Sequence, residues 1–209
     1  MANFYRKNQS GRSMIEMLGV LAIIAVLSVG GIAAYTKAMG EYRWNKALEQ
    51  WNSIIGLMNQ YKSQLNLSDR SRPESETSLL PLISNFSDLP AEMRTNDKDI
   101  IKDALGNKMR IYAHGTGYIG IRSSTTEENS SACRIFLTMG QYHHALVERV
   151  LIYTLGGGEQ SGNVYYGDRK CRNGVRCLKN IGPADIAAIC KENPVCKDKS
   201  NCNFLMYWF

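Results

Sequence analysis

The residue types best suited to covalent or metal chemistry in this chain are six cysteines, none of which lies before residue 133. They are Cys133, Cys171, Cys177, Cys190, Cys196 and Cys202. An even number of cysteines in one region of an exported protein is typical of disulfides that form outside the cytoplasm. The alternative is a structural zinc site, whose ligand pairs are usually about two to four residues apart. Here the nearest cysteine pairs are six positions apart, which favours disulfides if the chain is exported.

A second candidate for chemistry is Glu16, an acidic residue at the edge of a long apolar stretch. The residues from Met17 to Thr36 form a run of 20 without a charged side chain. At about 1.5 Å per residue, a helix of that length spans roughly 30 Å, the hydrocarbon thickness of a bilayer. The stretch therefore predicts one membrane-spanning helix. An unpaired ionisable side chain at its edge is costly and usually marks a functional contact.

The segment before the apolar stretch is short, polar and basic, and reads MANFYRKNQSG. Its basic flank, which continues to Arg12, is expected on the cytoplasmic side, so everything after residue 36 is expected outside the cytoplasm. An ordinary signal peptide has a shorter apolar stretch, of about 7–15 residues, and its small-residue cleavage site follows that stretch. Here the small residue, Gly11, precedes it. An uncleaved signal anchor fits the hydropathy equally well, and Glu16 is the residue that argues against it.

Gly11, the sequence Arg12-Ser13-Met14-Ile15-Glu16 and the apolar helix together resemble the class III signal of type IV prepilins and related pseudopilins. The resemblance is close over residues 9–39. In that family a membrane-embedded peptidase cuts after the glycine and methylates the new N-terminus. The resemblance implies that residues 1–11 are a removed leader and that Arg12 is the first mature residue. Arg12 departs from the family pattern, which usually has Phe, Met or Leu there.

The same resemblance implies a role in filament assembly for Glu16, the fifth mature residue. Its carboxylate would pair with the N-terminal ammonium of a neighbouring subunit, neutralising two charges in an apolar core and fixing the register between subunits. Many pilins have a proline in the exposed half of this helix, where the chain has Gly30-Gly31. Paired glycines weaken a helix by roughly 1 kcal/mol each relative to alanine. They are consistent with a bending point or with close helix packing.

The helical pattern continues beyond the membrane. Apolar residues recur at spacings of three, four or six through residues 37–65, and no proline occurs before Pro73. This predicts one helix from about Met14 to Leu65, within a helical region of residues 12–65. Residues 12–36 would be its transmembrane and assembly half. The apolar face of the second half would hold a disulfide-stabilised globular head of residues 66–209. The resemblance implies an α+β pilin fold, with the long helix packed on a small antiparallel sheet and extra helices.

The head is expected to contain loops, a hairpin, two helices and a final strand. The predicted elements are loops over residues 66–99 with a short helix near 78–84, strands at 109–113 and 118–122, helices at 132–155 and 183–190, and a strand at 204–209. The hairpin rests on two β-rich runs joined by a Gly-containing turn, and the helices on Ser130-Ser131 and on Pro183 near their first turns. The segment Asp103–Asn107 is similar to the Asp…Gly turn that enters the sheet in many pilins.

The order of these elements looks like the type IVb branch of pilins, although leaders there are usually longer. In that branch a disulfide joins the start of the earlier helix to the end of the later one. The resemblance therefore implies the pair Cys133–Cys190, leaving Cys171–Cys177 and Cys196–Cys202 as local pairs. Only the first of these pairs rests on the resemblance itself, because cysteine connectivity cannot be deduced from sequence alone.

No enzyme, cofactor or metal site is expected. No catalytic or phosphate-binding motif is found, and Gly156–Gly158 is followed by Glu and Gln, which is typical of a helix stop. His143 and His144 are adjacent on a predicted helix, about 100° apart, and cannot share a metal as residues four apart do. The net charge is +6, or +4 without the leader, and shows no dense basic stripe. Binding of nucleic acid is therefore not the default expectation.

The resemblance implies a structural subunit of a type IV pilus, polymerising through its N-terminal helix into a surface filament for adhesion, motility or related processes. Its implied partners are prepilin peptidase, copies of itself and other pilins in a helical filament, an inner-membrane assembly platform, and the lipid bilayer before assembly. The chain would cross the inner membrane once, with the head outside the cytoplasm, and become part of an extracellular pilus after assembly.

Two alternative functions stay open. One is a pseudopilin of a type II secretion system or a minor pilin, which would keep the same anchor. The other is a DNA-binding or DNA-uptake pilin. That alternative rests on the basic residues of the C-terminal third, Lys170, Arg172, Arg176, Lys179, Lys191, Lys197 and Lys199. Salt-sensitive binding of DNA would favour it.

Overall fold

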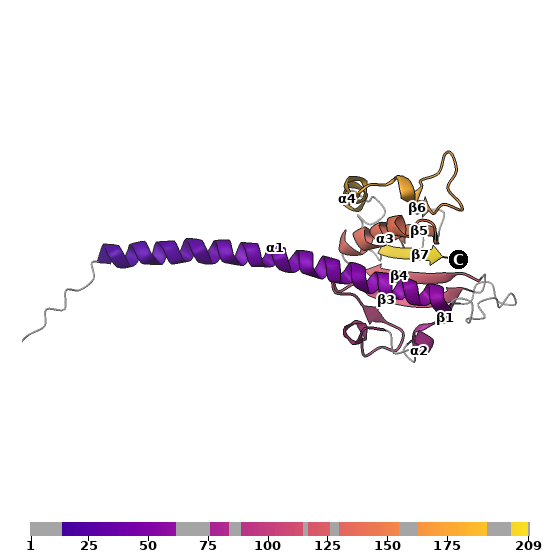
Figure 1. The fold of residues 1–209 in the computed structure, drawn as a ribbon, viewed down its shortest axis with the longest axis horizontal. Helices are drawn as coiled ribbons and strands as arrows, with labels where there is room; N and C mark the ends of the chain where they lie inside the picture. The colour runs from indigo at the N-terminus through magenta and orange to yellow at the C-terminus, as the bar shows by residue number, and fades with distance from the viewer. Residues whose placement is uncertain are drawn as a thin grey trace, which may run out of the picture. The chain divides into compact units, whose positions relative to one another are not determined.

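The computed structural model describes residues 14–61, 76–83, 89–114, 117–125, 130–154, 163–191 and 202–208. The chain divides into two compact units, residues 1–43 and residues 44–209. Each contains part of the first helix, α1, which runs from Met14 to Tyr61 (Figure 1). The predicted end of this helix, about Leu65, lies outside the described residues.

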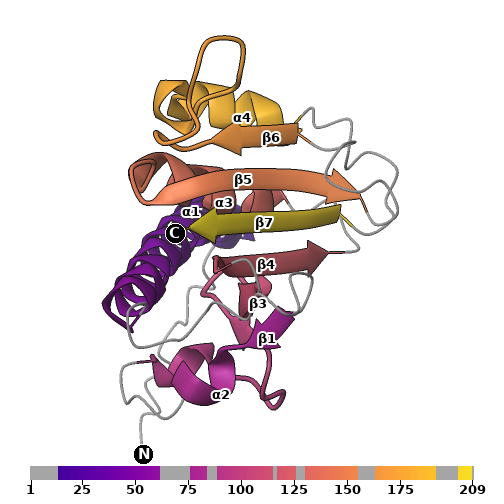
Figure 2. The same cartoon turned by 90° about the vertical axis from the view of Figure 1, so that its right-hand side faces the viewer.

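In the second unit, the strands form one seven-stranded antiparallel sheet. They are β1 (Glu76–Ser78), β2 (Ile101–Lys102), β3 (Lys108–His114), β4 (Ile119–Thr125), β5 (Val147–Thr154), β6 (Asn163–Tyr166) and β7 (Cys202–Trp208). Their order is β1-β3-β4-β7-β5-β6, and β2 pairs with β3. The last strand thus lies between β4 and β5 (Figure 2). Every residue of β7 is buried, which confirms the predicted buried final strand.

Short helices accompany the sheet. They are α2 (Leu80–Ile83), η1 (Ala91–Met93), α3 (Ser130–Tyr142), η3 (Leu178–Asn180) and α4 (Pro183–Lys191). The predicted hairpin is confirmed, since β3 and β4 pair antiparallel with Ile111 opposite Ile121. The helix predicted from Pro183 is also confirmed. The architecture is therefore α+β, as predicted, with the second half of the long helix packed on an antiparallel sheet.

The prediction of one helix over residues 132–155 is wrong in its second half. Helix α3 ends at Tyr142, and after a turn the chain forms β5. Val150 and Ile152 point into the core while Arg149 and Leu151 alternate with them, which is the period of a strand. A short apolar run cannot be assigned to helix or strand by periodicity alone. Here pairing with β6 and β7 on both sides decides the outcome.

The two histidines of this region therefore lie in a turn and contact different elements. His143 Nε2 lies 2.7 Å from Asn52 Oδ1 on α1. His144 Nδ1 lies 2.9 Å from Asp168 Oδ2, after β6. Burial lowers the pKa of His143 from its ordinary value. The pair ties the end of α3 to two other parts of the head.

The core lies between one face of the sheet and the helices α1 and α3. Trp51 of α1 contacts Phe136 of α3 edge to face, with ring centroids 4.8 Å apart. Phe136 in turn lies 5.8 Å from Phe204 of β7. All three side chains are at most 2% exposed. Buried aromatic side chains of this size dominate core energetics, so the second half of α1 is an integral part of the head.

Gly167 allows the chain after β6 to return closely against β5. Its N–H donates to the Glu148 carbonyl at 2.8 Å. A Cβ at this position would lie 1.8 Å from the carbonyl oxygen of Val147, which is backbone. We therefore expect Gly167→Ala to lower the free energy of unfolding by about 1–3 kcal/mol, the usual range for overpacking.

Chemical unfolding of the full-length chain in detergent measures this effect. Gly56→Ala is the matched control, because a Cβ there meets nothing within 4 Å inside α1. Alanine in a helix interior is favoured over glycine by about 1 kcal/mol, so the control should be stabilised. Equal effects of the two substitutions would contradict the close approach at Gly167.

Candidate functional site

The first part of the candidate site is the apolar half of α1. Its large apolar side chains from Met14 to Ile32 are all more than half exposed within the described chain. Among the described residues, α1 is the one helix that is long and apolar enough to cross a membrane. Soluble monomers rarely expose a contiguous apolar surface of this size. Lipid or other protein chains are therefore expected to cover it.

Glu16 lies in the first turn of α1, among the exposed side chains of Met14, Ile15 and Met17. Within the described part of the chain, no ion pair includes its carboxylate, which is exposed. A carboxylate at the edge of an apolar surface is thus available to a cation from outside the described chain. Gly11 and Arg12, the predicted processing residues, lie outside the described residues.

In the head, the buried side chain of Asp103 organises the turn between β2 and β3. Its Oδ1 accepts the N–H groups of Leu105 at 3.0 Å and Asn107 at 2.9 Å. Its Oδ2 accepts Nδ2 of Asn107 at 2.9 Å and Nε1 of Trp51 at 3.2 Å. One carboxylate therefore fixes the turn and fastens it to α1.

Neighbouring side chains extend this network in both directions. Gln50 of α1 accepts the N–H of Ala104 at 2.8 Å, and Ser131 at the start of α3 donates to Asn107 at 3.0 Å. Gly106 has φ +89°, a left-handed conformation that favours glycine. The resemblance of Asp103–Asn107 to an entry turn is thus matched by a turn that joins α1, the sheet and α3.

Two disulfides of the head are defined. Cys133 in the first turns of α3 is bonded to Cys190 near the end of α4, 57 positions later. Cys171 is bonded to Cys177 within a short loop. These are the pairings given in the sequence interpretation, and they exclude these four cysteines as zinc ligands. Cys202 is also disulfide-bonded. Cys196 lies outside the described residues, so the pair Cys196–Cys202 stays a prediction.

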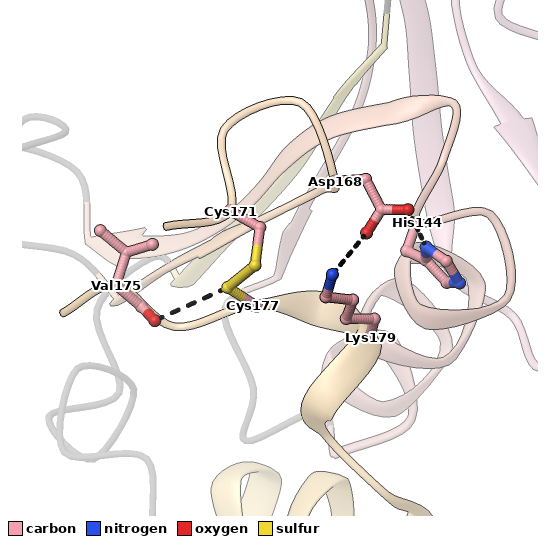
Figure 3. Close-up of a disulfide and its surroundings, with 6 residues drawn as sticks. All are labelled: His144, Asp168, Cys171, Val175, Cys177 and Lys179. Atoms are coloured by element: carbon pink, nitrogen blue, oxygen red, sulfur yellow. Dashed lines mark hydrogen bonds and ion pairs between the residues drawn. A yellow bond between two sulfur atoms is a disulfide. The ribbon is translucent and has the colours of Figure 1, made fainter. Parts of the chain in front are cut away.

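The Cys171–Cys177 loop is held at its base by Asp168, as Figure 3 shows. Asp168 contacts His144 Nδ1 at 2.9 Å and Lys179 Nζ at 3.7 Å. All three side chains are partly exposed, so these two contacts contribute little to stability. Their effect is to fasten the loop to the turn after α3 and to η3.

The basic residues on which the DNA-binding alternative rests are surface residues where the structure describes them. Of the seven, Lys170, Arg172, Arg176, Lys179 and Lys191 are described, and all are exposed. Lys179 faces Asp168, and Arg176 donates to Asn163 and stacks over Tyr165 at 5.7 Å. Four other cations lie at the corner of the sheet formed by β2, β3 and β4, and the sequence analysis did not predict this cluster. The sequence signal for it was the alternation of Lys108 and Arg110 with apolar residues.

Comparison of the chain with protein-family models finds none that matches, and comparison with curated proteins finds no relative. The class of this protein is therefore assigned from its described helices, strands and disulfides alone. They define an α+β head, stapled by disulfides, whose first helix continues from a chain segment able to cross a membrane.

Proposed function

We propose that this protein is a structural subunit of a type IV pilus. The observation that carries the proposal is the exposed apolar half of α1, with Glu16 at its edge and a head that has a core of its own. In the bilayer, lipid would cover this surface. In a filament, the same surface would pack against the helices of neighbouring subunits, and Glu16 would meet the N-terminal ammonium of one of them.

Further properties of the proposed subunit follow from the prepilin signal. Prepilin peptidase would cut between Gly11 and Arg12. The chain would then stay in the inner membrane, with its head outside, until an assembly platform adds it to the filament. In this role the disulfides and the Asp103 turn would keep the head folded outside the cell. We propose neither an enzyme activity nor a cofactor.

Processing is tested by the intact mass and the N-terminal peptide of protein recovered from sheared cell surfaces. The expected chain starts at Arg12, with or without one methyl group, and is lighter by two hydrogens for each disulfide. Recovery from membranes alone, with a chain that starts at Met1, would identify an uncleaved signal anchor. A processed chain that stays in the membrane would favour a pseudopilin.

Glu16→Leu is expected to lower incorporation into filaments by at least about a hundredfold. An ammonium left unpaired in an apolar core costs about 3–5 kcal/mol, which corresponds to this factor. The measurement is the ratio of this chain in sheared filaments to that in membranes. Cleavage and membrane insertion of the variant should be unchanged.

Glu41→Leu makes the same change on the same helix and is the control. Glu41 is exposed and lies beyond the apolar stretch. Its replacement should change incorporation less than tenfold, since no buried charge loses its partner. Normal incorporation of Glu16→Leu would show that the assembly role assigned to Glu16 is wrong.

A further inference from the structure

Four cations gather on one face of the sheet, at the corner formed by β2, β3 and β4. We call them the basic corner: Lys102, Lys108, Arg110 and Arg122. Lys102 lies directly opposite Lys108, and Arg110 lies directly opposite Arg122. Their neighbours Ile101, Met109, Ile111 and Ile121 are buried in the core. Since side chains alternate along a strand, the four cations all point away from the core.

This arrangement is unfavourable for the isolated head. Like charges directly opposite each other on adjacent strands destabilise a sheet. Between described residues, no ion pair includes Lys102, Lys108 or Arg110, all of which are exposed. Only Arg122 has an acidic partner there, Glu76 of β1. The basic corner therefore carries an excess of positive charge that an external anion would offset.

Arg122 is already held in one orientation. Both terminal nitrogens donate to the carboxylate of Glu76. Its guanidinium also lies 5.1 Å from the ring centroid of Tyr112. The Tyr112 ring occupies the space over Gly120, where a Cβ would lie 2.6 Å from it. The positive charge of Arg122 is thus held in place beside Arg110, which lies directly opposite it. The Nε of Arg122 is buried and has no hydrogen-bond partner in the described chain.

A pocket of about 310 Å³ opens between these side chains. It is lined by Ile100, Lys108, Met109, Arg110, Arg122 and Ser124. Three of the six are cations. The Ser124 hydroxyl donates to Asn203 on β7, and both terminal nitrogens of Arg122 donate to Glu76. Among the described residues that line the pocket, Lys108 and Arg110 therefore supply the free cationic donors. Their charge and their number of N–H donors fit an anion with several acceptor oxygens, which arginine and lysine bind through charge-assisted hydrogen bonds.

We propose that the basic corner is a binding site for a phosphate or sulfate group. The inference is independent of the proposed filament function, since it rests only on residues of the head. Lys108 and Arg110 supply exposed donors, and Arg122, held by Glu76 and Tyr112, supplies positive charge beside them. Lys102 adds positive charge at the edge of the site.

The test is calorimetric titration of the full-length chain in detergent with inorganic phosphate and, separately, with inorganic sulfate, at constant ionic strength. The variant Lys108→Gln/Arg110→Gln removes two exposed cations that make no described ion pair, so its fold should be kept. Its dissociation constant should rise at least about tenfold, because it loses two charge-assisted hydrogen bonds. Lys170→Gln/Arg172→Gln loses the same charge elsewhere and should change binding less than threefold.

Two further arms decide the outcome. Arg122→Gln should weaken binding as well, with its folding checked by thermal unfolding. Glu127 and Glu128 follow Ser124 closely in sequence. The variant Glu127→Gln/Glu128→Gln removes both carboxylates. If this variant binds the anions and the wild-type chain does not, the chain's own carboxylates occupy the basic corner and the proposal fails. Equal weakening by both double variants would also overturn it, since binding would then reflect net charge alone.

The anionic group can belong to a free ion or to a polymer, and competition distinguishes these sources. Polyphosphate and dextran sulfate are added to the phosphate-bound chain, with uncharged dextran as the control. The concentration of anionic groups needed for displacement is compared between the polymers and inorganic phosphate. If the polymers need a far lower concentration, a polymer is the occupant. Equal concentrations identify the free ion.

Discussion

Replacing Asp103 by alanine is expected to lower the free energy of unfolding of the head by about 3–5 kcal/mol. The carboxylate is 2% exposed and accepts four hydrogen bonds, from Trp51, Leu105 and two groups of Asn107. Each buried donor that loses its acceptor costs about 1–3 kcal/mol. The measurement is urea unfolding of the full-length chain in detergent, followed by tryptophan fluorescence, since Trp51 and Trp208 are buried.

Asp103→Asn separates the two halves of this network. The amide keeps an acceptor for the N–H groups of Leu105 and Asn107, but turns a donor toward Trp51 and Nδ2 of Asn107. Its effect should therefore lie between wild type and Asp103→Ala. Asp97→Ala is the exposed control, since the Asp97 side chain accepts a single hydrogen bond among the described residues, from the N–H of Asp99 at 2.9 Å. If Asp103→Ala destabilised no more than this control, the turn would not join α1 to the sheet energetically.

The elements that the sequence predicts best are those with local signals. Helix α4 begins at the proline that predicts it, and the β3–β4 hairpin has its glycine turn between two β-rich runs. The final strand is a continuous apolar run, typical of a strand buried on both faces. Its place between β4 and β5 has no local signal, because pairing partners far apart in sequence decide it.

Strand β5 shows why the rest could not be predicted. Its segment follows a predicted helix, with no proline or glycine between Tyr142 and Val147, so a continuing helix is the simplest interpretation of the sequence. Two tertiary features oppose it. Gly140 of α3 lies where a Cβ would be 2.7 Å from Val150, which lets the strand pack closely under the helix. Strands on both sides also supply hydrogen bonds that an isolated segment lacks.

The candidate sites differ in the same way. Glu16 is visible from sequence because it interrupts an apolar stretch, and its environment is set by that stretch alone. The basic corner combines residues from β2, β3 and β4, and its opposed charges appear only once the register is known. Site residues brought together by strand register are thus hidden from a search for motifs.

Removing the disulfide between α3 and α4, as Cys133→Ala/Cys190→Ala, is expected to lower the free energy of unfolding by about 4 kcal/mol. In the chain-entropy model the effect grows with the length of the closed loop, and here the cysteines are 57 positions apart. The loss should be local first, because Ile186 is the buried residue of α4 in the described chain. Trypsin should then cleave at Lys191 before the sheet unfolds.

The Cys171–Cys177 disulfide is the internal control, because it closes a loop of only 6 positions. The same model gives about 2 kcal/mol for Cys171→Ala/Cys177→Ala. Urea unfolding and timed trypsin digestion of both variants measure the difference. Early cleavage at Lys191 in the first variant alone would mean that the long-range disulfide holds α4 on the head. If both variants lost equal stability, loop length would not govern the effect, and packing around each disulfide would have to explain it.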